Sequence, residues 1–164
     1  MPIEAGMYQY MKQDPGVSSY VGGRIFGSKL PKDKTAMPAI VWTVVLTQEL
    51  GSHAHGSSGL RSKRFQIDSY ASKYMDSVKT SDAVRALFQN FSGTLPDGSS
   101  VNGCIIIRDM DFPYEPGTSG YVYRHLLEID VIYSEYVTPF IGPNVTVPGI
   151  DDIIFDTVED DGQP

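Results

Sequence analysis

The sequence predicts an α+β domain with a mostly antiparallel sheet of four to five strands, two helices on one face, and an extended, proline-rich C-terminal arm. Residues 64–91 change from the two-residue period of a strand to the three- and four-residue spacing of an amphipathic helix. Alternating stretches rich in β-branched residues lie on both sides of that unit. Prolines then become frequent, so residues 1–135 are predicted as the domain and 136–164 as the arm.

The N-terminal part predicts one helix and two strands. Apolar residues recur at helical spacing over 3–13, and the Asp-Pro-Gly sequence at 14–16 ends this helix. Residues 17–20 are expected to form a turn. A short apolar strand is predicted at 24–26 and a longer one at 39–46, where side chains alternate strictly.

Residues 47–59 are rich in Gly, Ser and His and have no periodicity, which predicts an overlong hairpin tip before the strand that starts at Arg64. Ser72 is expected to cap the following helix. Small residues on the helix would allow close packing against the strand it has just left. The predicted inner stripe comprises Tyr74, Ser77, Ser81, Val84, Leu87 and Phe88.

Two further strands are predicted at 101–108 and 121–134, separated by a loop at 109–120 that contains two prolines and two glycines. One face of the last strand is apolar apart from His125, which is read as a hydrogen-bonded sheet histidine.

The second face of the last strand mixes Arg124 and Glu128 with Leu126. It is too apolar for plain solvent and too charged for a core. This mixed character predicts a protein-covered face and makes these three residues candidates for a subunit interface.

Charge is unevenly distributed along the chain. The net charge is −7, with ten Lys/Arg against six Asp/Glu in residues 1–80 and three against fourteen in 81–164. This balance argues against a general nucleic-acid binder. It suggests contact between opposite ends of neighbouring molecules, or an acidic solvated tail. Arg61, Lys63 and Arg64 form a basic cluster. Two interpretations are possible, a contact with an acidic neighbour or an ordinary solvated strand start, and the acidic second half of the chain favours the contact.

Motifs that carry catalytic or metal chemistry are sparse. His53 and His55 lack the further ligands that a zinc site needs. Cys104 adjoins three isoleucines, which predicts a buried, inert thiol. Asp109 and Asp111 have no basic partner nearby in sequence and are read as surface loop carboxylates. We therefore expect no enzyme activity, no cofactor and no metal. No apolar run is long enough to span a membrane, and the start lacks a signal sequence, which predicts a protein made in a cytoplasm.

The arm at 136–164 carries three prolines within eleven residues and an acidic end. Apolar residues within that end require burial, either on their own domain or on a neighbouring chain. These residues, further interface candidates, are Ile150, Ile153, Ile154 and Phe155.

The order of these segments resembles the tail completion, or tail terminator, family of long-tailed bacteriophages. The resemblance rests on GGRIF, then LPKDKTAMPAIVW, then RFQIDSYASKYMDSVKTSDAVRALF, then YRHLLEIDVIYSE near residue 135. Each stretch is short and hydrophobic, so their order and spacing carry the resemblance across 3–135. The arm after residue 135 departs from the compact pattern of the family.

The resemblance implies a non-enzymatic protein of the virion tail or neck, made in the cytoplasm of a bacterial host. Such proteins form a ring, usually of six copies, at the head-proximal end of the tail tube, end tube polymerisation and dock the tail to the head. The implied partners are further copies of the chain, the major tail tube protein and the head–tail connector, or neck, protein. DNA would pass through without sequence-specific binding. The alternative is another neck or tail-tube component, such as a connector, a stopper or a tube-type subunit.

Overall fold

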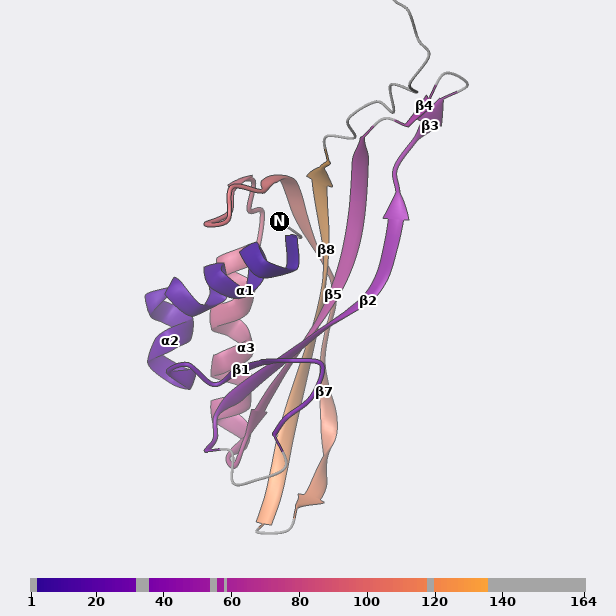
Figure 1. Cartoon of the computed structure of the whole chain (residues 1–164). Helices are drawn as coiled ribbons and strands as arrows, with labels where there is room; N and C mark the ends of the chain where they lie inside the picture. Colours follow the sequence, from indigo (N-terminus) through magenta and orange to yellow (C-terminus); the bar gives the residue numbers. More distant parts are fainter. Residues whose placement is uncertain (1–2, 32–35, 54–55, 58, 118–119, 136–164) are drawn as a thin grey trace, which may run out of the picture.

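The computed structural model describes residues 3–31, 36–53, 56–57, 59–117 and 120–135 (Figure 1). The predicted arm at 136–164 lies outside this part of the chain. The helices and strands are, in order, α1 (Ile3–Gln13), α2 (Pro15–Val21), β1 (Ile25–Gly27), β2 (Ala39–Glu49), β3 (Ser52–His53), β4 (Gly56–Ser57), β5 (Leu60–Ala71), α3 (Tyr74–Phe88), β6 (Gly93–Thr94), β7 (Ser100–Gly117) and β8 (Gly120–Ser134).

Six strands form one sheet in the order β1-β2-β5-β8-β7-β6. All neighbours are antiparallel except β1 and β2, which run parallel. Strands β3 and β4 pair separately at the end of the β2–β5 hairpin, which extends beyond the rest of the sheet (Figure 1). The α+β class and the mostly antiparallel sheet are confirmed. Among the described residues the main sheet has six strands rather than four to five, and there are three helices rather than two.

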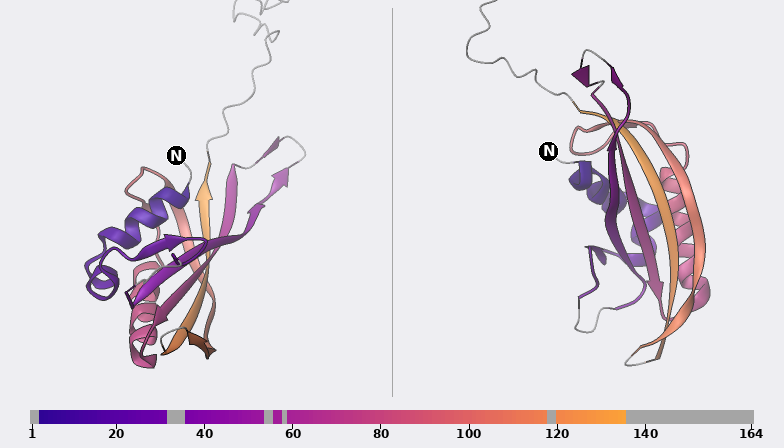
Figure 2. Two further views of the ribbon diagram at one scale, coloured as in Figure 1. Left: turned by 60° about the horizontal axis from the view of Figure 1, so that its bottom comes forward. Right: turned by 90° about the vertical axis from the view of Figure 1, so that its right-hand side faces the viewer.

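The helices lie on one side of the sheet (Figures 1 and 2). Helix α3 packs on β5, β7 and β8, and α2 packs on α3. The core fills the space between the helices and the sheet. Its largest fully buried side chains are Phe65, Phe88, Met7, Met11, Ile40, Ile67, Leu127, Ile129, Val17, Val21, Val84 and Val131.

The predicted turn at 17–20 is wrong, because α2 begins immediately after α1 ends. Asp14 occupies the N-cap of α2, and its Oδ1 accepts a hydrogen bond from the Val17 amide at 2.8 Å. Pro15 follows at the first helical position, where its missing N–H costs nothing. Gly22, at φ 59°, ends the helix. Asp-Pro thus stops one helix and starts the next.

The start of α3 also differs from the prediction. The N-cap position is Lys73 rather than Ser72, and it makes no side-chain capping bond. Ser77 and Ser81 are buried as expected, which lets the helix lie close to β5 and β8. Tyr74 is exposed, so it does not belong to the inner stripe.

Two hairpins organise the sheet, and both are longer than the sequence predicted. The β2–β5 hairpin is confirmed, but β2 continues to Glu49 and β5 already begins at Leu60. The expected loop at 109–120 is wrong, since β7 continues to Gly117 and pairs with β8. Prolines are tolerated there because β7 is an edge strand over this stretch, where an amide N–H on the outer side needs no ladder partner.

Two β-bulges lie at nearly the same height in the sheet. One falls between Val44 and Leu46 of β2, and another between Ile106 and Arg108 of β7. The pairing register places them on opposite sides of one row across the sheet: Val44, Phe65, Ile129 and Ile106. A bulge bends its strand and increases the local twist.

Candidate assembly interface

The two faces of β8 differ in what covers them. Side chains at odd positions, such as Leu127 and Ile129, point into the core beneath the helices. Arg124, Leu126 and Glu128 share the opposite face, as predicted, and no described helix covers it (Figure 2). We call this second surface the helix-free face. Leu126 is only 5% exposed within the single chain, so its neighbours in the sheet already shield it.

Arg124 is held by groups on adjacent strands. Its Nε donates to Asp68 Oδ1 at 2.9 Å, and Gln66 Nε2 donates to Asp68 Oδ2 at 2.8 Å. The guanidinium also lies 4.5 Å from the centre of the Phe112 ring. Since the Asp68 side chain is 7% exposed, both of its oxygens exchange water for protein donors, as a buried carboxylate requires.

Two more ion pairs follow along the helix-free face. Arg64 donates to Asp130 through Nε at 2.7 Å and through its terminal nitrogen at 2.8 Å. This two-pronged bond raises the pKa of the Arg64 guanidinium. Arg108 Nε lies 3.6 Å from a Glu128 oxygen. The charges at the centre of this face are therefore largely neutralised within one chain.

The basic cluster predicted from the sequence is divided between the two faces. Arg61 pairs with Glu135 at 2.6 Å, and Lys63 pairs with Glu4 at 2.6 Å, whereas Arg64 lies on the helix-free face. Burial opposes ionisation of Glu4, but the hydrogen bond and charge of Lys63 outweigh it and lower the Glu4 pKa. Alternation along β5 explains the division, and all three cations have acidic partners in their own chain.

Several candidate residues fall outside the described part of the chain. They include the four apolar residues of the arm, Ile150, Ile153, Ile154 and Phe155, and also His55. His53 ends β3. Among the residues that the structure describes, no group of three or more His, Cys, Asp or Glu could hold a metal ion.

The prediction that Asp109 and Asp111 lie in a surface loop is wrong, because both belong to strand β7 and both have partners distant in sequence. Asp111 Oδ1 lies 2.6 Å from Nδ1 of His125, and Asp109 Oδ1 lies 2.5 Å from its Nε2. Tyr74 donates to Asp111 at 2.9 Å, and Arg85 forms an ion pair with Asp109. The reading of His125 as a hydrogen-bonded sheet histidine is confirmed. An Asp-x-Asp pattern opposite a histidine would have revealed this cluster, had 109–120 been recognised as a strand.

This cluster ties β7, β8 and α3 together. Each ring nitrogen of His125 lies within hydrogen-bond distance of a carboxylate oxygen, Asp111 on one side and Asp109 on the other. The hydrogen bond to Asp111 raises the pKa of the Tyr74 hydroxyl. The polar groups of the cluster thus bond one another across three elements, an arrangement that supports the fold.

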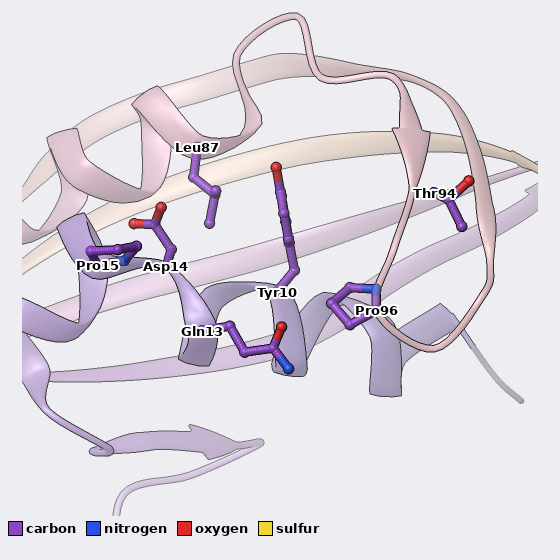
Figure 3. Close-up of a pocket in the computed structure, with 7 residues that line it drawn as sticks. All are labelled: Tyr10, Gln13, Asp14, Pro15, Leu87, Thr94 and Pro96. Carbon is purple, nitrogen blue, oxygen red and sulfur yellow. The ribbon is translucent and has the colours of Figure 1, made fainter.

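An open hollow of about 400 Å³ lies between the end of α1, the end of α3 and the segment that follows β6 (Figure 3). Asp14, at its rim, is already engaged as the α2 cap. Burial, followed by the charge of Asp14, raises the pKa of Tyr10. The lining residues are Tyr10, Gln13, Asp14, Pro15, Leu87, Thr94 and Pro96, and no nucleophile–base pair occurs among them.

The single cysteine behaves as predicted. Cys104 is buried on β7, and burial raises the pKa of its thiol to about 12, so little thiolate forms at neutral pH. No helix in the described part of the chain is long and apolar enough to cross a membrane.

The described sheet thus has one helix-covered face and one face on which charged side chains pair with each other. Comparison with known proteins identifies the class of protein. The family described as Tail completion protein gp17 matches residues 5–134, so the chain belongs to this family. It is a structural protein of a phage tail.

A solved structure supports the fold. A chain from the structure titled "Virion of native gene transfer agent (GTA) particle" superposes with a TM-score of 0.60 at 15% sequence identity. The match covers 80% of this chain and 94% of that chain. No curated protein matches the sequence significantly.

Proposed function

We propose that this protein forms a ring, of six copies, at the head-proximal end of the phage tail tube. There it ends tube polymerisation and provides the surface that docks the tail to the head connector. The observation that carries this proposal is membership of the tail completion family over residues 5–134. Its partners are further copies of itself, the major tail tube protein and the neck protein.

The charge of the chain is compatible with a ring that DNA crosses. Six copies at −7 each carry about −42, which repels phosphate rather than gripping it. The arginines of the helix-free face form ion pairs with carboxylates, so their positive charges are largely balanced within the chain. DNA would therefore move through without sequence-specific binding.

The experiment is tube growth in vitro. Purified tail tube protein is polymerised with and without this protein, and tube lengths are measured by electron microscopy while native mass spectrometry gives the copy number. We expect tubes that stop growing and carry one ring at one end. Incorporation along the whole tube would instead identify a tube-type subunit. Binding to heads without any effect on tubes would identify a connector or stopper.

We also propose that the arm at 136–164 docks on another subunit or on the neck protein. The prolines of this sequence favour an extended segment, and its four large apolar side chains are expected to need burial. Each contributes roughly 1.5–3 kcal/mol when buried. Ordering the backbone opposes this at about 1–2 kcal/mol per residue, so the contact must be extensive.

Truncation after Glu135 tests the arm. The shortened chain retains every described helix and strand, so we expect it to fold with an unchanged melting temperature and to assemble less stably or fail to join heads to tails. A sharply lower melting temperature with unchanged ring stability would show instead that the arm packs on its own domain.

A further inference from the structure

The sheet leaves part of β2 without a neighbour on its outer side. Strand β1 pairs with residues 40–42 of β2, and no described strand pairs with the outer side beyond them. We call residues 43–48 the β2 window. Within it, Val45 is 46% and Leu46 is 42% exposed. An exposed edge that carries large apolar side chains is a template for strand pairing.

Strand β7 leaves a matching stretch on the opposite edge of the sheet. Strand β6 pairs only with Ser100 and Val101, and in the described chain nothing pairs with the outer side of 103–108. We call this stretch the β7 window. Ile105 is 51% and Ile107 is 38% exposed. In the described chain, the unpaired outer edge of β7 continues beyond this window to Gly117. A single chain therefore shows two edge segments that carry exposed aliphatic side chains.

The two windows lie at the same height. The register gives one row across the sheet from window to window: Leu46, Arg64, Asp130 and Ile105. Paired residues point to the same side of a sheet. Leu46 and Ile105 therefore both lie on the helix-free face, at opposite ends of this row.

Strand direction also matches. Because β2, β5, β8 and β7 are successively antiparallel, β2 and β7 run in opposite directions. A second copy placed beside the first in the same orientation would therefore continue the antiparallel pattern. Strand β1 bounds the β2 window at one end, and β6 bounds the β7 window at the other. The β7 bulge at Ile107 bends the strand near the height at which β1 ends at Gly27.

We propose that the β2 window of one copy pairs antiparallel with the β7 window of a second copy, with Leu46 opposite Ile105. The inference rests on the proposed ring and supplies its joint. The contact is head to tail, because the two edges are different surfaces, so each copy can bind one neighbour on each side. Backbone hydrogen bonds and burial of the four exposed aliphatic residues hold the joint.

Two substitutions test the joint. Leu46→Lys disables the β2 window, and Ile105→Lys disables the β7 window; both positions are exposed, so both variants should fold normally by circular dichroism. Each substitution should weaken self-association about tenfold or more, because it removes apolar burial and places an ammonium group in the contact. Met75→Lys, at an exposed position on α3, is the matched control and should assemble like the wild type.

Mixing the two variants gives the sharper test. Each retains one intact window, and the intact windows are complementary. An equimolar mixture should therefore form a one-to-one dimer and nothing larger in native mass spectrometry. Wild-type copy number in either single variant, or a mixture that contains only monomers, would overturn the joint.

The tube-growth assay keeps this inference separate from the proposed function. A chain that assembles through these windows but leaves tube length unchanged would refute the terminator role and leave the joint intact. Variants that keep the wild-type ring would refute the joint even where the wild type stops tube growth.

Discussion

The two faces of β8 solve the same burial problem in different ways. On the helix-covered face, Leu127, Ile129 and Val131 are completely buried by an opposing layer of side chains. On the helix-free face, Leu126 and Glu128 are almost as buried, although no described helix lies above them. Long, paired side chains such as Arg124 provide that shielding, since their alkyl stems lie over the sheet while their charged ends bond carboxylates.

The difference shows that a sheet face can be shielded from water without becoming apolar. Charged groups tolerate such a position only when each has a well-placed partner. The helix-covered face therefore depends on packing, and the helix-free face depends on a set of specific pairs. Substitutions on the two faces should have correspondingly different effects.

The largest effect is expected from Leu127→Ala. It leaves a cavity between two packed layers, and we expect a loss of about 3–4 kcal/mol in the free energy of unfolding. Leu126→Ala, one residue away, should lose about half as much, because nothing fixed lies above it and the site can relax. Urea unfolding measures both. Equal losses of unfolding free energy in the two variants would contradict the view that the two faces of β8 are stabilised in different ways.

Next in size is Asp68→Ala. It leaves Arg124 and Gln66 without their shared acceptor on a shielded surface, and we expect a loss of about 2 kcal/mol. Asp68→Asn should lose less, because the amide oxygen still accepts one bond. The control is Arg61→Ala, whose ion pair with Glu135 is exposed; it should cost less than about 1 kcal/mol. If Asp68→Ala left the free energy of unfolding unchanged, the ion pairs and hydrogen bonds of Asp68 would not stabilise the helix-free face.

A smaller effect depends on pH. The pKa of Glu4 is lowered from its ordinary value of 4.5, so its stabilising contribution is complete above that value and is lost as the pH falls through the lower folded value. Lys63→Met removes the partner. The wild type should therefore lose slightly more stability than the variant between pH 6 and pH 3, by about 0.5 kcal/mol after solvent screening. Thermal unfolding at each pH measures both proteins. An equal loss of stability in the wild type and in Lys63→Met over this pH range would contradict the prediction.

The smallest effect concerns Cys104. With a thiol pKa of about 12, the folded protein should react with iodoacetamide at pH 8 far more slowly than the unfolded chain. Mass spectrometry of alkylation with and without urea measures the difference. Rapid labelling of the folded protein would show that this end of β7 opens readily.

The sequence was sufficient for the central unit and for most of the sheet. The change of period at 64–91 correctly predicted β5 followed by α3, because burial on one face imposes that spacing on both elements. The loop predicted at 109–120 failed because prolines and glycines usually end strands, whereas an edge strand tolerates them. The N-terminal turn failed because Asp14 and Pro15 serve as a helix stop and a helix start at once.

The candidate site was only partly readable from the sequence. The mixed character of Arg124, Leu126 and Glu128 reflects burial and ion pairs within the sheet of one chain, and their role at a subunit interface stays a prediction. The partners of these charges lie on β5 and β7, and His125 meets carboxylates 14 and 16 residues away. Such pairs are fixed by hairpin register, and one misassigned loop is enough to hide them.

The bulges of β2 and β7, which lie at nearly the same height, bear on the size of any assembly built edge to edge. A head-to-tail repeat closes only when the rotation from copy to copy divides a full circle; otherwise it grows as a spiral. Here that rotation would be set by one extra backbone residue on each edge, Val45 on β2 and Ile107 on β7. The number of copies in a closed assembly would then depend on the angle between neighbouring copies, which the backbone geometry of these two edge strands would determine.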